Sequence, residues 1–238
     1  GSTLDYVYRN APQGEGAIGR FFDKVYLDSI GWKGIRVRKT NLQKTILDAV
    51  SQLQARQMPV RVVDIAAGHG RYVLDALQGV PGIEQILLRD YSELNVSQGQ
   101  QRIDERGLQQ VARFEQGNAF DYDSLASLAP APTLGIVSGL YELFPGNADI
   151  KASLAGLAAA IPPGGILVYT GQPWHPQLET IAWSLTSHQN NAPWVMRVRT
   201  QGEMDALVAE AGFGKQTQLI DEYGIFTVSL AVRRADGR

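Results

Sequence analysis

Hydrophobic residues along the chain follow two alternating spacings, and this alternation predicts the order of strands and helices. Short runs of branched apolar residues are typical of strands buried on both faces, whereas apolar residues three or four positions apart are typical of helices. Such runs predict strands at 60–65, 84–89, 133–138 and 166–170, and a further short strand is predicted at 112–116. Helical spacing predicts helices at 70–78, 92–106 and 148–160. The alternation predicts an α/β fold, a Rossmann-like, doubly wound and mainly parallel sheet.

The C-terminal part departs from this alternation. Leu178–Ser187 has helical spacing, and Val195–Arg199 is a candidate short strand. Thr200 and Glu203 form a capping-box pattern, which predicts a helix over 201–211. Two final strands, 215–220 and 225–233, are predicted to form a hairpin. The complete prediction is a seven-stranded sheet with an antiparallel C-terminal hairpin.

The part before the first strand is predicted to be an arm followed by helices. Thr3–Gly19 is rich in glycine, proline and polar residues, which is typical of a loop. Large apolar residues predict a helix over 18–30, and Gly31–Gly34 is expected to break it. An amphipathic helix is predicted over 35–54. We therefore assign residues 1–56 to an N-terminal arm with helices and residues 57–238 to the main unit of the same domain.

The first strand ends in a pattern typical of a nucleotide site. Asp64, Ala66, Gly68 and Gly70 stand at alternating positions, and small residues allow a backbone to turn sharply and a ligand to approach it. A dinucleotide fingerprint is excluded because Val73 occupies the place of its third glycine. In a doubly wound sheet the ligand lies at the carboxyl ends of the strands, so the residues after the other strands matter equally.

These residues together resemble motifs of the class I S-adenosylmethionine-dependent methyltransferases. The acid before a small-residue loop is similar to motif I, and Asp90, Gly117-Asn118 and Pro163-Gly164-Gly165 follow in the order of that class. Ala66 departs from the more usual glycine. The resemblance implies S-adenosylmethionine as cofactor and S-adenosylhomocysteine as product, and it implies that the N-terminal helices are a substrate lid.

The resemblance also implies roles for the cofactor-binding candidates. Asp64 would pair with the ammonium of the cofactor, although a loop-capping acid is the alternative. Asp90 would accept the ribose hydroxyls, and Tyr91 would lie against the adenine, with packing beside the strand as the alternative. Asn118 would accept the adenine amine through its side-chain carbonyl. The remaining candidates line the same loops, where each has an alternative packing role: Ala66, Gly68, Gly70, Ala119, Phe120 and Ser138.

The catalytic candidates follow the fourth and fifth strands. His175 is the first candidate for a general base, because an imidazole titrates near neutral pH, and loop fixing is the alternative. Tyr141 and Glu142 are candidates for contacting the acceptor, with a structural role as the alternative. Arg71 and Tyr72 could reach the cofactor carboxylate or the acceptor. The basic stretch Lys33–Lys44 is typical of a solvated helix face, and the alternatives are contact with an anionic acceptor, a lipid head group or the cofactor carboxylate. Three scattered histidines have no metal-ligand spacing, so no metal is predicted.

Composition narrows the class of protein. The chain has 238 residues, 44% hydrophobic and 19% charged, with a net charge of −2 and no cysteine. Disulfides and a cysteine nucleophile are excluded, and a basic nucleic-acid footprint is absent from the whole-chain charge. No apolar run reaches the ~18 residues of a transmembrane helix. A cytoplasmic location is expected.

The sequence therefore predicts a methyltransferase that acts on a small-molecule or lipid-like acceptor by in-line displacement. Segments such as Leu-Leu-Arg-Asp-Tyr-Ser-Glu-Leu-Asn and Gly-Gln-Pro-Trp-His-Pro-Gln are similar to a bacterial methyltransferase family. The resemblance implies a covalently fused α/β-hydrolase domain in some members. Two alternatives stay open: a non-catalytic module of the same fold that regulates a larger polypeptide, and an RNA or protein methyltransferase.

Overall fold

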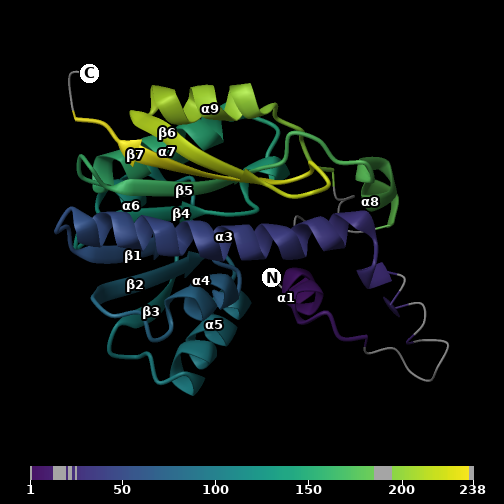
Figure 1. Ribbon diagram of the computed structural model, residues 1–238, viewed down its shortest axis with the longest axis horizontal. Helices are drawn as coiled ribbons and strands as arrows, with labels where there is room; N and C mark the ends of the chain where they lie inside the picture. Colours follow the sequence, from purple (N-terminus) through teal and green to yellow (C-terminus); the bar gives the residue numbers. More distant parts are fainter. Residues whose placement is uncertain (1, 13–19, 21–22, 25, 185–194, 236–238) are drawn as a thin grey trace.

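A seven-stranded sheet forms the centre of the molecule (Figure 1). The computed structural model describes residues 2–12, 20, 23–24, 26–184 and 195–235. The strand order is β3-β2-β1-β4-β5-β7-β6. The strand bounds are β1 Val60–Asp64, β2 Ile83–Asp90, β3 Ala112–Gln116, β4 Leu134–Val137, β5 Ile166–Gly171, β6 Phe213–Ile220 and β7 Thr227–Arg233. The first five strands are parallel and β7 is antiparallel to both of its neighbours, which confirms the predicted sheet and hairpin.

Helices cover both faces of this sheet (Figure 1). The described helices are α1 Ser2–Arg9, α3 Ile30–Ala55, α4 Arg71–Leu77, α5 Glu93–Glu105, α6 Tyr122–Ala126, α7 Asn147–Ala160, α8 Leu178–Ser184 and α9 Gln201–Glu210, with a 3₁₀ turn at Tyr141–Leu143. One hydrophobic cluster joins α3, α4 and α5 to the sheet, and a second joins α6, α7 and α9 to its other face. Neighbouring residues Val62 and Val63 belong to different clusters. Both faces are covered, which explains why the strands have continuous apolar runs.

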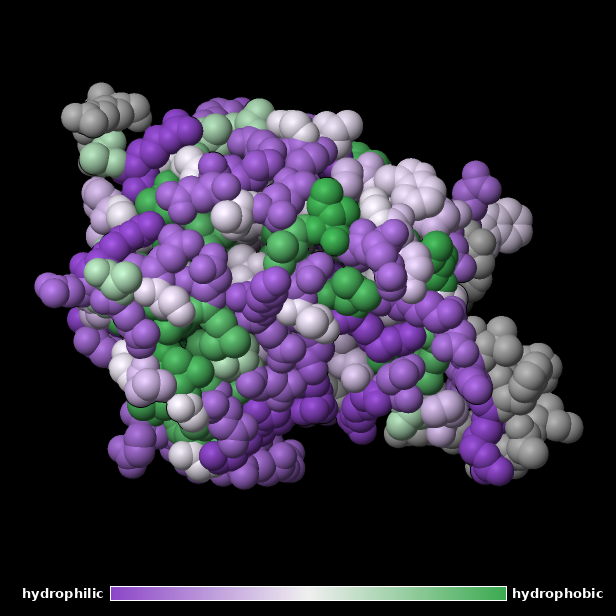
Figure 2. Space-filling model, viewed as in Figure 1, coloured by the Kyte–Doolittle hydropathy of each residue, from purple (hydrophilic) through white to green (hydrophobic). Residues whose placement is uncertain are grey.

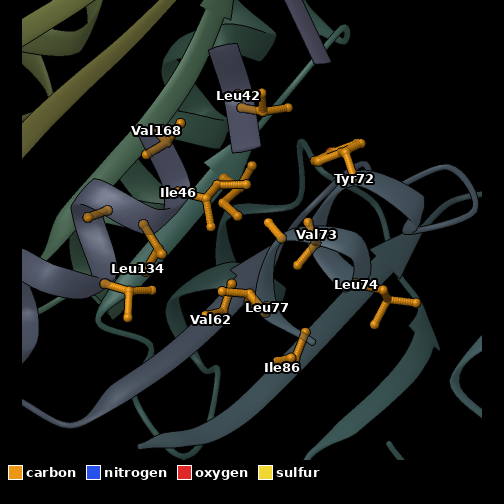
Figure 3. Close-up of a cluster of buried hydrophobic side chains, with 14 of the residues drawn as sticks. Leu42, Ile46, Val62, Tyr72, Val73, Leu74, Leu77, Ile86, Leu134 and Val168 are labelled. Carbon is orange, nitrogen blue, oxygen red and sulfur yellow. The ribbon is translucent and has the colours of Figure 1, made fainter. Parts of the chain in front are cut away.

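Helix α3 is part of the main core (Figure 3). Leu42 and Ile46 are fully buried and pack in the cluster that holds Val62, Leu134 and Val168. Full burial of each such side chain stabilises the fold by roughly 1.5–3 kcal/mol. These contacts fix the middle of α3 on the sheet. The lid prediction therefore concerns the segment before α3, where it stays a prediction.

The N-terminal prediction was wrong in two places. The expected loop over Thr3–Gly19 contains helix α1, because Val7 is fully buried in an apolar cluster with Leu27 and Trp32. The expected break at Gly31–Gly34 is absent, and α3 runs through it. A Cβ at Gly34 would lie 3.0 Å from the Phe226 ring, so close packing accounts for this glycine. Of the helix predicted over 18–30, residues 18, 19, 21, 22 and 25 lie outside the described residues.

The C-terminal predictions differ in outcome. The capping pattern is confirmed in part: Thr200 Oγ1 accepts a hydrogen bond from the Glu203 amide at 3.1 Å, whereas the Glu203 side chain binds Arg197 and Asn147. The short strand at Val195–Arg199 is wrong, because this segment has no regular structure. Helix α8 begins at Leu178 as predicted, and residues 185–187 lie outside the described part of the chain.

The face of the molecule over α3 is largely hydrophilic, with hydrophobic residues in several separate groups (Figure 2). No helix in the described ranges is long and apolar enough to cross a membrane. Among the same residues, no group of three histidine, cysteine or acidic side chains is placed to hold a metal ion.

Candidate active site

The carboxyl ends of the five parallel strands meet at one edge of the sheet (Figure 1). The loops after these strands carry every predicted site residue. The turn between β6 and β7 reaches the same edge, because Thr227 at the start of β7 pairs with Gly171 at the end of β5. The topology therefore brings the sequence motifs together, as expected for a ligand site in a doubly wound sheet.

The loop after β1 requires glycine at two positions. Gly68 and Gly70 have φ angles of +58° and +68°, in the left-handed region that side chains rarely adopt. A Cβ at Gly70 would also lie 2.4 Å from Leu88 Cδ1. The Gly70 amide donates to the Ala67 carbonyl at 2.8 Å and opens α4. The turn is tight, and the amides of Ala67, Gly68 and Gly70 all donate hydrogen bonds within the protein.

Asp64 ends β1 as a fully buried carboxylate. It accepts hydrogen bonds from the Ala66 amide at 3.2 Å and from the hydroxyl of Tyr72. Burial raises the pKa of Asp64 to about 7, although both hydrogen bonds act to lower it. A cation that arrives beside this carboxylate favours its ionised form. Asp64 is therefore a buried carboxyl whose charged form an adjacent cation would stabilise.

Asp90 connects the first two loops. Its Oδ2 accepts from the Gly68 amide at 2.9 Å, and its Oδ1 accepts from the Ser92 amide at 3.0 Å and from Asn95 Nδ2 at 2.9 Å. The side chain remains partly exposed. Sequence reasoning missed Asn95, although its place in the first turn of a helix capped by Ser92 is the available signal. Asp90 both holds the glycine loop and presents a carboxylate at its rim.

The loop after β3 has a rigid turn. The amide of Phe120 donates to Asn118 Oδ1 at 3.0 Å, so the Asn118 carbonyl already has one partner and keeps a second acceptor position. Asn118 is exposed and Ala119 is buried. The Phe120 ring packs edge-on against Phe144, with 4.5 Å between ring centres. Tyr91, from the neighbouring loop, is 76% exposed, so its ring is available to cover a flat ligand.

A buried arginine, Arg89, packs against the loop after β3. Arg89 donates to Ser124 Oγ at 2.6 Å and pairs with Glu115 at 3.3 Å. A Cβ at Gly117 would lie 2.3 Å from Arg89 Nη2. Gly117 is therefore required by this close approach as well as by its place after a strand.

The loop after β4 holds Ser138, Tyr141 and Glu142. Ser138 is buried at the end of the strand. The Tyr141 hydroxyl is also buried, and it shares a hydrogen bond of 2.9 Å with Ser153 Oγ; burial raises its pKa. Glu142 Oε1 accepts from Arg38 Nη1 at 3.2 Å. Both acceptor-side candidates, Tyr141 and Glu142, line a small pocket together with Thr170 and Gln172.

Arg199 fixes this loop. Its guanidinium donates to the carbonyls of Tyr141 and Phe144, the latter at 2.7 Å, and its Nε donates to Asn147 Oδ1 at 2.9 Å. Sequence reasoning missed this role because it assigned the segment to a strand. The available signal is that Arg197 and Arg199 directly precede the helix cap Thr200, a pattern that does not favour a strand.

His175 has the geometry of a loop-fixing side chain. Its Nδ1 accepts from the Gln177 amide at 3.1 Å, so the neutral ring carries its proton on Nε2. A Cβ at Gly31 would lie 3.0 Å from that Nε2 atom, which places the ring against α3. Burial lowers the pKa of His175, and Asp221 opposes the shift. The lone pair on Nδ1 already accepts a hydrogen bond within the loop. A general-base role for His175 stays a prediction.

The two remaining histidines stay outside the proposed chemistry. His69 is buried in the loop after β1, as expected for a residue that shapes this loop. His188 lies outside the described residues.

The strand order, with an antiparallel β7 inserted between β5 and β6, is the fold of the class I S-adenosylmethionine-dependent methyltransferases. The chain belongs to the family described as "Putative methyltransferase", whose model matches residues 1–233. Fold and family confirm the predicted class, and S-adenosylmethionine is the cofactor of that class.

One curated relative and several solved structures are similar to this chain. "Uncharacterized protein YnbC" of Escherichia coli strain K12 is 68% identical over 234 residues, which cover 98% of this chain and 40% of that protein. The chain thus spans two fifths of the length of the relative it matches.

The similarity to solved structures concerns the fold. A "possible exported protein" from Bordetella parapertussis has a TM-score of 0.75 at 18% identity, over 98% of this chain and 79% of its own. Magnesium protoporphyrin IX methyltransferase from Synechocystis, with bound S-adenosylhomocysteine, has a TM-score of 0.63 at 18% identity, over 98% and 94%. An O-methyltransferase family protein from Burkholderia thailandensis has a TM-score of 0.62 at 16% identity, over 99% and 68%.

Proposed function

We propose that this chain transfers the methyl group of S-adenosylmethionine to a small-molecule or lipid-like acceptor. The observation that carries the proposal is Asp90, a partly exposed carboxylate at the end of β2 that is held 2.9 Å from the amide of Gly68. A carboxylate that could bind a ribose and a loop of mostly small residues thus lie together at one edge of the sheet, which supports the proposal. Family membership supports the reaction.

The residues of the site fit such a cofactor. Asp90 would accept the ribose hydroxyls, and Tyr91 would cover the adenine beside Asn118. The loop Ala66–Gly70 would pass under the amino-acid portion, near the buried carboxylate of Asp64. Ala119, Phe120 and Ser138 line the loops between these groups. Each role is supported by position at the carboxyl ends of the strands and is testable by substitution.

The chemistry needs alignment more than proton transfer. When bound, the cofactor supplies an electrophilic methyl group on a sulfonium. The chain holds the two reactants in line, an effect that lowers a barrier by up to roughly 7–11 kcal/mol in well-oriented systems. Each acceptor-side candidate already has a partner within the protein: Tyr141 bonds Ser153, His175 bonds its own loop and Glu142 accepts from Arg38. A base is needed only for an acceptor that loses a proton.

Exposed apolar residues support a small or lipid-like acceptor. Trp174 follows β5 at the carboxyl edge, and it is 51% exposed. Trp183 on α8 is 93% exposed, and α8 lies at the same end of the molecule (Figure 1). Exposed aromatic rings of this kind favour apolar ligands. The net charge of −2 does not favour an RNA acceptor. The cytoplasmic location and the fused hydrolase domain stay predictions.

Calorimetric titration with S-adenosylmethionine and S-adenosylhomocysteine tests the proposal. Wild-type protein is expected to bind both, and Asp90→Ala is expected to weaken binding at least tenfold, because charge-assisted hydrogen bonds contribute about 1.5–3 kcal/mol. Glu93→Ala, which removes an exposed acid three residues away, is the matched control and should bind as wild type does. Folded wild-type protein that binds neither compound would refute the proposal.

If binding is confirmed, cell extracts with labelled methyl donor would reveal the acceptor. Label in the small-molecule or lipid fraction supports the proposed acceptor class. Label in RNA or protein would favour the alternative of an RNA or protein methyltransferase. Binding without any transfer would favour the non-catalytic module.

A further inference from the structure

A buried arginine of α3 lies at the same edge of the sheet as the cofactor loops. Arg38 is 3% exposed, and its Nη1 donates to Glu142 Oε1 at 3.2 Å. Its guanidinium lies over the Phe226 ring, 4.8 Å from the ring centre. Its Nε has no hydrogen-bond partner among the described residues. Burying a cationic N–H without a partner is costly, so this atom has capacity for a ligand.

The surroundings of Arg38 place it near the loop after β1. Burial is the largest single effect on the pKa of Arg38 and lowers it. The opposing effects of its neighbours, Tyr8 and Glu142 foremost, outweigh burial, so the pKa is raised overall. Tyr72, whose hydroxyl binds Asp64, is close enough to Arg38 for the guanidinium to influence its pKa. A Cβ at Gly139 would lie 3.1 Å from Arg38 Nη2. The cation therefore lies between the buried carboxylate of β1 and the loop after β4.

This arrangement suits a zwitterion. An α-amino acid group carries an ammonium and a carboxylate on the same carbon, and the site has a carboxylate (Asp64) and a guanidinium (Arg38) on neighbouring elements. A guanidinium has five N–H donors in a planar fork and binds carboxylates with two parallel hydrogen bonds. Glu142 uses one of these donors, and Tyr8 is also hydrogen-bonded to the guanidinium. The Nε–H has no partner among the described residues, so it is the donor that remains for a second carboxylate.

We propose that Arg38 binds the carboxylate of the cofactor's amino-acid portion and that Glu142 is a positioning residue that orients the guanidinium. Helix α3 is then part of the cofactor site. This inference rests on the proposed function. Because Leu42 and Ile46 anchor α3 in the core, the guanidinium is presented from a rigid element. Arg38 joins the cofactor site to the loop that carries the acceptor-side candidate Glu142.

Two ligands separate this carboxylate role from a general loss of structure. S-adenosylhomocysteine has the amino-acid portion, whereas 5′-methylthioadenosine has the same adenosine and thioether without it. Calorimetry on Arg38→Gln should show at least tenfold weaker binding of S-adenosylhomocysteine and binding of 5′-methylthioadenosine within twofold of wild type. Lys44→Gln, an exposed position on the same helix with the same charge change, should leave both affinities unchanged.

Two further variants test the geometry. Arg38→Lys keeps a buried cation without the fork and should lose part of the preference for S-adenosylhomocysteine over 5′-methylthioadenosine. Glu142→Gln should reduce the same preference several-fold with little change for 5′-methylthioadenosine, which a merely structural role would not produce. Melting temperatures identify any variant that fails to fold, and Arg38→Lys then carries the test.

The outcomes are distinct from those that test the proposed function. Equal weakening of both ligands in folded Arg38→Gln and Arg38→Lys, or no weakening of either, overturns the inference and leaves the proposed function standing. Wild-type protein that binds neither ligand overturns the proposed function, and the inference with it.

Discussion

Replacing Gly70 by alanine tests whether the loop after β1 is as tight as its geometry indicates. The residue has a φ angle of +68°, and the new Cβ would lie 2.4 Å from Leu88 Cδ1. Gly79 is the matched control. Its φ angle is +77°, and a Cβ there would have no neighbour within 4 Å. Both substitutions impose the same backbone conformation on alanine, and only one imposes a collision.

The expected magnitudes follow from these two effects. Alanine in the left-handed region costs about 1–2 kcal/mol. Forcing a methyl group into a packed core costs a further ~1–3 kcal/mol. We therefore expect Gly70→Ala to lower the free energy of unfolding by about 2–5 kcal/mol and Gly79→Ala by about 1–2 kcal/mol. The effect on the unfolded chain is the same for both and cancels in the difference.

Urea unfolding followed by tryptophan fluorescence measures both values, and the chain has four tryptophans. Gly70→Ala should also weaken S-adenosylhomocysteine binding, whereas Gly79→Ala should not. A double variant with Leu88→Ala removes the colliding atom, so the extra cost of the Gly70 substitution should shrink in that background. Equal destabilisation of the two glycine variants would refute the reasoning from packing.

Three further predictions concern the same edge of the sheet. Because burial raises the pKa of Asp64 to about 7, S-adenosylhomocysteine should bind more tightly at pH 8 than at pH 6 in calorimetry, and Asp64→Asn should lose this dependence. The Asp64 carboxyl keeps its proton up to about pH 7 in the folded protein and loses it near pH 3.8 in the unfolded chain. Its contribution to stability is therefore present at low pH and is lost as the pH rises from about 4 to 7. The urea midpoint of the wild-type protein should fall over this range relative to that of Asp64→Asn. Arg199→Gln should lower the free energy of unfolding by about 2–4 kcal/mol, since it leaves the carbonyls of the loop after β4 without donors, and faster hydrogen exchange over 141–147 should accompany it. Tyr141→Phe should cost about 1 kcal/mol of stability and leave S-adenosylhomocysteine affinity unchanged, and a large loss of affinity would show that its hydroxyl serves the site.

The order of strands and helices could be predicted from the sequence because the signals are local. Branched apolar runs indicate β1, β2, β4 and β5, whose central residues are buried, whereas β3 alternates buried and exposed residues. Ser92 caps α5 and Gly107 follows it with a φ angle of +65°, as residue type alone indicates. The alternating small residues after Asp64 indicate the class of site for the same reason. A loop that must turn sharply restricts its own composition.

Other features depended on contacts between distant parts of the chain. The fully buried Val7 joins a cluster with Leu27 and Trp32, and Gly34 packs against Phe226, so the predicted loop and break are helices. No local pattern shows these neighbours. Propensity is a weak signal where packing of this kind decides the conformation.

The arrangement of the polar side chains was likewise decided by tertiary structure. Arg38 and Glu142 are 104 positions apart in the sequence, and Arg199 reaches a carbonyl 58 positions away. The backbone amide of Gln177 donates to Nδ1 of His175, so this contact determines which ring nitrogen carries the proton. The sequence by itself determined the class of fold and the position of the cofactor motifs, because these follow from periodicity and from backbone constraints on small residues. Only the folded chain decided which charged groups are buried together, because that pairing depends on which side chains tertiary packing removes from solvent.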